Sequence, residues 1–87
     1  MLNLNHKNLD VWQLAIKLVS TIYQITSKYP KEEVFGLTSQ TRRAVVSISA
    51  NLAEGSSRKS LAERKRFYEI SRSSLVEVDN HIEVAKE

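Results

Sequence analysis

The chain contains no cysteine, one proline and two glycines among its 87 residues. Without thiols it can form neither a disulfide nor a thiolate metal site, so we expect a reducing, cytoplasmic location. No stretch reaches the roughly 18 apolar residues of a membrane span, and the first ten residues lack the apolar core of a signal peptide. The sequence therefore predicts one soluble domain over residues 1–87, with no membrane partner.

The scarcity of proline and glycine leaves three segments with helical periodicity, at about residues 8–28, 38–54 and 60–86. Apolar residues of the first segment form two adjacent series, which predicts contact with two helices, or with one helix and another chain. In the third, a sustained heptad with one polar end is typical of a packing seam, and it consists of two series with seven-residue spacing: Leu61, Tyr68, Leu75 and Ile82, and Arg64, Ser71, Val78 and Ala85. Short connections favour antiparallel neighbours, so the predicted fold is all-α, an up-and-down antiparallel helical bundle.

The helix ends carry recognisable signals. Gly55 is expected to end the second helix in a positive-φ conformation, and Ser60 with Glu63 fits a capping box for the third. Side-chain caps for the first two helices are expected from Asn8 or Asp10, and from Thr38 or Ser39. Between those helices, Val34, Phe35 and Leu37 are expected to pack under the end of the bundle.

Positive charge is concentrated in one part of the chain. The net charge is +3, but residues 42–72 hold eight basic and three acidic residues, a net of +5. Such a segment attracts polyanions, although a solvated surface explains it equally well. No base-reading module is recognisable, so any nucleic-acid contact would be to the backbone. The candidate contacts are Arg42, Arg43, Arg58, Lys59, Arg64, Lys65 and Arg66. The Arg42–Arg43 pair fits either phosphate contact or buried pairing with glutamates of the third helix.

Candidate catalytic and metal groups are sparse. Ser47, Asn51 and Glu54 share a helix face, but no histidine lies near them in sequence to activate a serine. Glu77 and His81 are spaced for a salt bridge or a metal pair, and a third ligand is lacking. We therefore expect no enzymatic activity, metal, cofactor or small-molecule substrate.

Three stretches of sequence carry a family resemblance: LDVWQLAIKLVSTIY, FGLTSQTRRAVVSISANLAEGSSRKS and FYEISRSSLVEVD. Over residues 9–85 the chain resembles the bacterial four-helix-bundle proteins encoded in intervening sequences of 23S ribosomal RNA genes. The same fold group includes the accessory variability determinant (Avd) of diversity-generating retroelements. The resemblance implies a barrel-like homopentamer without enzymatic activity. Its retroelement relatives bind a reverse transcriptase and nucleic acid through a basic surface.

The motif positions that match this family are Gln40, Arg42, Arg43, Asn51, Glu54 and Gly55. The resemblance implies that they determine fold and assembly, with Arg42, Arg43 and Arg58 as RNA contacts. Family members continue into a fourth helix, whereas this chain stops at Glu87, so we expect an apolar groove in its place. The predicted function is a non-enzymatic oligomeric bundle that binds RNA or a ribonucleoprotein. The alternative is a protein-interaction scaffold whose groove receives a partner helix.

Overall fold

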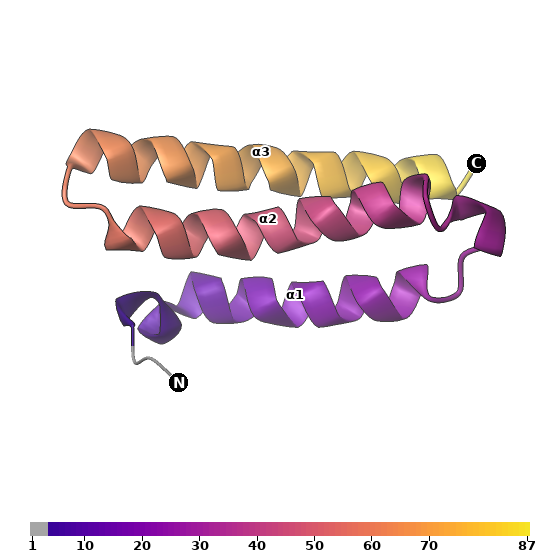
Figure 1. The fold of residues 1–87 in the computed structure, drawn as a ribbon, viewed down its shortest axis with the longest axis horizontal. Helices are drawn as coiled ribbons and strands as arrows, with labels where there is room; N and C mark the ends of the chain where they lie inside the picture. Colours follow the sequence, from indigo (N-terminus) through magenta and orange to yellow (C-terminus); the bar gives the residue numbers. More distant parts are fainter. Residues whose placement is uncertain (1–3) are drawn as a thin grey trace.

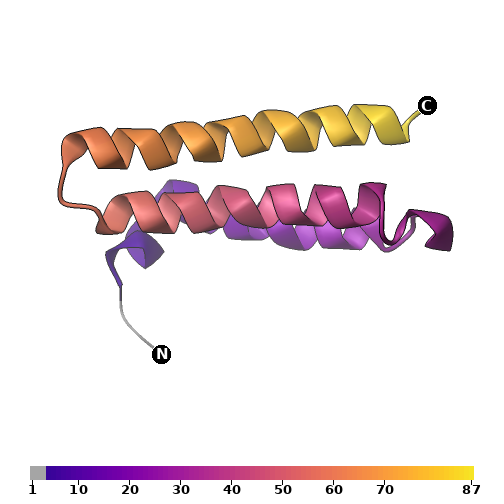
Figure 2. The same cartoon turned by 45° about the horizontal axis from the view of Figure 1, so that its top comes forward.

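A computed structural model describes residues 4–87 and shows three long helices joined by short turns (Figure 1). The helices are α1 (Asp10–Thr26), α2 (Leu37–Ser57) and α3 (Leu61–Ala85), with 3-10 turns η1 (Asn5–Asn8) and η2 (Lys31–Glu33). Along their described lengths, α1 and α3 each pack on α2 but not on each other. Figure 2 shows α1 behind α2, with α3 on another side of it. The all-α, up-and-down antiparallel arrangement is confirmed.

Within residues 4–87, no helix is long and apolar enough to cross a membrane.

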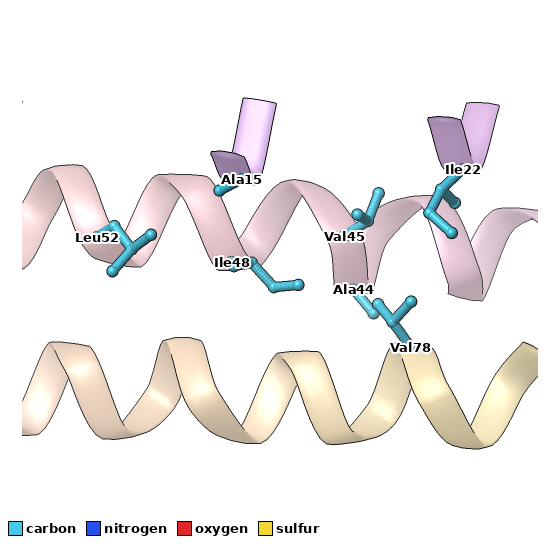
Figure 3. Close-up of a cluster of buried hydrophobic side chains, with 7 residues drawn as sticks. All are labelled: Ala15, Ile22, Ala44, Val45, Ile48, Leu52 and Val78. Carbon is cyan, nitrogen blue, oxygen red and sulfur yellow. The ribbon is translucent and has the colours of Figure 1, made fainter. Parts of the chain in front are cut away.

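The apolar core is centred on α2. Its buried side chains are Ala15 and Ile22 from α1, Ala44, Val45, Ile48 and Leu52 from α2, and Val78 from α3. In Figure 3, Val45 points toward α1, and Val78 rises from α3 toward Ala44. The central helix therefore buries apolar residues on two sides, while each outer helix buries only part of its apolar surface.

The contact between α2 and α3 is made largely by small polar residues. The buried residues of α3 are Ser71, Ser74, Val78 and His81. The Ser71 hydroxyl donates to the Ile48 carbonyl oxygen at 2.8 Å, and the Ser74 hydroxyl donates to the Ser47 hydroxyl at 2.9 Å. Of the two predicted heptad series, one contains the buried residues Ser71 and Val78. In the other, Leu61 and Leu75 are 80% and 47% exposed, so the seam packed within the chain follows the first of these two.

Gly55 does not end α2, because the helix continues to Ser57 and neither glycine has a positive φ. The predicted role of Gly55 is therefore wrong. A Cβ atom at Gly55 would lie 2.7 Å from Cε1 of Tyr68 and 3.1 Å from Cβ of Phe67. Glycine is needed here because α3 approaches the α2 backbone too closely for a side chain.

The cap at the start of α3 is confirmed, since the Ser60 hydroxyl accepts from the Glu63 backbone N–H at 3.2 Å. The other side-chain caps are wrong. Helix α1 follows Leu9 without a side-chain cap, so neither Asn8 nor Asp10 serves. Helix α2 begins after Gly36, and its first residue, Leu37, donates its N–H to the Glu33 carboxylate at 3.2 Å.

That carboxylate takes the place expected for Thr38 or Ser39, because α2 starts one residue earlier than predicted. The turn before it also differs from expectation. Phe35 is 96% exposed and Val34 is 47% exposed, so neither packs under the bundle as expected.

An apolar groove separates α1 from α3. It has a volume of about 340 Å³ and is lined mainly by Val11, Leu14, Leu18, Leu52 and Leu75. Val11 and Leu14 remain 52% and 63% exposed. The groove expected from the sequence is therefore present. The first helix was expected to contact either two helices or one helix and another chain. Among the long helices of residues 4–87, α1 packs on α2 alone.

Candidate nucleic-acid interface

The seven predicted contact residues fall into two groups. Arg42 and Arg43 lie in the first half of α2, whereas the other five surround the turn from α2 to α3. These five are Arg58, Lys59, Arg64, Lys65 and Arg66. Sixteen residues separate Arg42 from Arg58, a rise of about 24 Å along a helix. The fold thus brings five cations together and places two elsewhere.

Arg58 joins the two helices that flank this turn. Its guanidinium lies 3.1 Å from the Glu54 carboxylate and 3.8 Å from that of Glu63. The same group stacks over the Phe67 ring, 5.0 Å from its centre. Arg58 is therefore partly neutralised, and a phosphate would compete with these partners.

Arg64 stabilises the turn between α2 and α3, since its Nε donates to the Arg58 carbonyl oxygen at 2.6 Å. The remaining cations are exposed and have no ion-pair partner among residues 4–87: Lys59, Lys65 and Arg66. We refer to these three as the turn cluster. None of the three forms an ion pair among the described residues, so they are more available to an anion than Arg58 is.

Arg42 binds α1, not α3. Its Nε donates to the Thr26 hydroxyl at 2.8 Å and its Nη2 to the Tyr23 carbonyl oxygen at 3.3 Å. Its guanidinium lies 4.4 Å from the centre of the Tyr23 ring. Pairing with a glutamate of the third helix, one of the two interpretations of this residue, is therefore wrong. No local sequence signal links Arg42 to residues sixteen or more positions earlier.

Two of the remaining motif residues, Asn51 and Glu54, form side-chain bonds near the α2–α3 contact. The Asn51 amide donates to the Ser47 carbonyl and hydroxyl oxygens at 2.8 and 2.9 Å. Because Ser47 also accepts from Ser74, the three side chains form one chain of hydrogen bonds between the helices. Glu54 instead pairs with Arg58. Gln40 lies exposed near the start of α2.

Of Ser47, Asn51 and Glu54, Ser47 and Asn51 are the two whose side chains hydrogen-bond to each other. His81 is buried on α3, and its Nε2 lies 3.8 Å from the Glu77 carboxylate. The described part of the chain holds no group of three or more potential metal ligands among His, Asp and Glu.

The stretch from residue 7 to residue 87 matches the family described as 23S rRNA-intervening sequence protein. The chain belongs to this family. A search of curated proteins returns no match. For this 23S rRNA-intervening sequence protein, the motif string from Phe35 to Ser60 now has a structural meaning. It spans α2 with the end of the turn before it and the turn after it, and it includes Arg42, which bonds α1, and Ile48, whose carbonyl oxygen accepts from Ser71 of α3.

The structure also groups the predicted residues Arg42 and Arg43 with Lys31, which was not predicted, in a second basic region. A cleft of about 790 Å³ lies where α1 ends and α2 begins, and Lys31, Arg42 and Arg43 line it. We refer to it as the α1–α2 cleft. Lys31 belongs to a separate turn, outside the basic segment of residues 42–72, so only the folded chain places it beside the two arginines.

Proposed function

We propose that this 23S rRNA-intervening sequence protein is a non-enzymatic RNA-binding bundle of the cytoplasm that contacts the phosphate backbone with the turn cluster. The supporting observation is the exposure of Lys59, Lys65 and Arg66 without a carboxylate partner among residues 4–87. Lysine and arginine that neutralise phosphates release condensed counterions, which gives affinity without sequence preference. RNA within a ribonucleoprotein offers the same phosphates.

Self-association belongs to the same proposal. Exposed apolar side chains line the groove, and a second chain that covers them would remove this surface from water. The family resemblance favours a homopentamer. Five copies of a +3 chain carry +15, and a weak turn cluster repeated five times becomes a multivalent site. Native mass measurement tests the subunit count, and a monomer at working concentration contradicts this part of the proposal.

A salt titration of RNA binding tests the turn cluster. We expect the affinity for a 23S-derived RNA fragment to fall steeply with salt, with the slope of log affinity against log salt set by the number of phosphates contacted. In the double variant K65Q/R66Q, the magnitude of this slope should fall by about 1.5 to 2.

The matched control is K17Q/K28Q, which removes the same charge from exposed lysines on and just after α1. It should change the slope much less, because both lysines lie outside the turn cluster. Absence of binding, binding that does not respond to salt, or an equal effect of the two variants would contradict the proposal.

The groove supports a second candidate, a scaffold that receives an apolar helix of a protein partner. Leu14 lines the groove and is 63% exposed, so most of its side chain is not packed within this chain and is open to a partner helix. This candidate predicts a protein partner that stays bound after nuclease treatment and at high salt, and is lost in L14Q/L75Q. Retained RNA binding in that variant would separate the two functions.

A further inference from the structure

The α1–α2 cleft has the size and position of a ligand site. Its volume of about 790 Å³ lies inside the roughly 300–1,000 Å³ range of small-molecule pockets. The end of α1, the turn with η2 and the first half of α2 form its walls. Arg42, which lines the cleft, lies about 24 Å along the helix from Arg58 at the α2–α3 turn, so the cleft is separate from that turn.

The lining of the cleft is positive and contains no carboxylate. It includes three cations, Lys31, Arg42 and Arg43, and no Asp or Glu. Neither Lys31 nor Arg43 forms an ion pair within residues 4–87. Hydroxyl groups of Tyr29, Ser39 and other residues add hydrogen-bond donors. A concave surface with charge of one sign focuses its field and concentrates counter-ions of the opposite sign.

The Arg42 side chain is held in one orientation by its contacts with α1. The bonds to Thr26 and Tyr23 use two of the five N–H donors of its guanidinium, and the Tyr23 ring supports one face. The other three donors have no partner among the described residues. An arginine held in place loses little conformational freedom on binding, and its planar fork matches the oxygens of a phosphate.

The remaining wall is apolar. Val34 and Val46 line the cleft and are 47% and 42% exposed, and Tyr29 adds a half-buried aromatic ring. An inorganic anion needs neither this surface nor this volume, whereas the sugar and base of a nucleotide would use both. The Leu37 amide at the α2 N-terminus already binds the Glu33 carboxylate, so the helix end contributes nothing to this argument.

We propose that the α1–α2 cleft binds a phosphate monoester of nucleotide size, with the phosphate between Arg42, Arg43 and Lys31 and the rest against Val34, Val46 and Tyr29.

Calorimetric titration of the 87-residue chain with adenosine monophosphate tests the cleft, with adenosine and inorganic phosphate as comparisons. We expect adenosine monophosphate to bind at least about tenfold more tightly than adenosine, which lacks the charged group. R43Q should weaken its binding about tenfold, because it removes a charge-assisted contact from an exposed residue without a structural partner. K31Q should act in the same direction.

The matched control is R66Q, which removes the same charge from an exposed arginine of the turn cluster. It should leave the binding of adenosine monophosphate within about twofold while weakening the binding of RNA that carries a 5′-hydroxyl end. The opposite pattern in R43Q, with nucleotide binding lost and binding of that RNA nearly unchanged, supports a cleft independent of the RNA surface. Failure of this proposal thus leaves the RNA-binding test standing, and the reverse also holds.

Two oligonucleotides that differ only in a 5′-phosphate identify where the monoester comes from. A preference for the phosphorylated one that disappears in R43Q places the phosphate at an RNA end, and binding of the free nucleotide alone places it on a small molecule. Either result supports the cleft. The proposal is overturned if neither the nucleotide nor the phosphorylated end binds, or if R43Q and R66Q weaken nucleotide binding equally.

Discussion

The two sides of α2 are built from different chemistry. Toward α3 the contact consists of serines, one valine, one histidine and the bare backbone at Gly55, with hydroxyl groups bonded across the helices. Toward α1 it combines apolar side chains such as Ile22 and Val45 with the hydrogen bonds of Arg42, and it opens into an apolar groove. Small residues let two helices approach closely, and directional hydrogen bonds fix their register. Apolar contact is less directional and leaves surface that another element can cover.

The largest effect is expected where α3 approaches α2 most closely. G55V should lower the free energy of unfolding by about 2–3 kcal/mol, because its side chain would overlap the Tyr68 ring and the Phe67 Cβ. Urea denaturation measures the loss. The control A50V places the same side chain on an exposed position of α2 and should cost only about 0.5 kcal/mol. Equal stability of G55V and the parent chain would show that α3 stands farther away.

The second prediction compares two apolar residues of α3. Val78 is 2% exposed and Leu75 is 47% exposed, although the sequence gives leucine the stronger apolar signal. V78A should lower the free energy of unfolding by about 2 kcal/mol, and L75A by less than about 0.5 kcal/mol at low protein concentration. A growing cost of L75A at higher concentration would indicate that another copy covers the groove. A larger effect of L75A at all concentrations would contradict the assignment of the buried face.

The third prediction concerns the hydrogen bonds between α2 and α3. S74A should lower the free energy of unfolding by about 1 kcal/mol, since it removes the partly buried bond to the Ser47 hydroxyl. S73A, one position away on the exposed side, should have almost no effect. Thermal unfolding of both variants gives the comparison, and similar midpoints would mean that the serine bond adds nothing to the interface.

The smallest expected effect is at Thr38 in the first turn of α2. It is a gain in the free energy of unfolding, whereas the preceding variants lose stability. The Thr38 hydroxyl is buried and has no hydrogen-bond partner. T38V keeps the shape and removes the unpaired group, so we expect a gain of about 0.5–1 kcal/mol in the free energy of unfolding. The isosteric change at Thr41, whose hydroxyl bonds the Leu37 carbonyl oxygen at 2.7 Å, should give no such gain. A loss of stability in T38V would indicate a partner for the Thr38 hydroxyl.

The elements of the fold were largely predictable, and their contacts were not. The ends of the first and third helices lie within two residues of expectation. Pro30, which follows the first helix, and Ser60, which precedes the third, are local signals that mark these boundaries. The role of Gly55 was misjudged because its neighbour Tyr68 comes from another helix. The same applies to Arg42, whose partners Tyr23 and Thr26 lie on α1.

The candidate site divides in the same way. The basic segment was predicted from the count of charged residues. The structure shows that Arg58 forms ion pairs with Glu54 and Glu63, whereas Lys59, Lys65 and Arg66 form none within residues 4–87. Lys31 was not predicted as a contact residue because it lies in a locally acidic turn, beside Glu32 and Glu33. Its relation to Arg42 and Arg43 depends on the direction in which the turn folds back.

By itself, the sequence determined the all-helical class, the number of long helices, the family and the concentration of positive charge. The family follows from the resemblance of its motif strings, and the other three follow from spacing or composition along the chain. Only the tertiary structure decided which face of each helix is buried, which cations keep a free charge and where Lys31 joins Arg42 and Arg43. Burial and pairing depend on residues distant in sequence, and helical periodicity carries no information about which neighbour covers a given face.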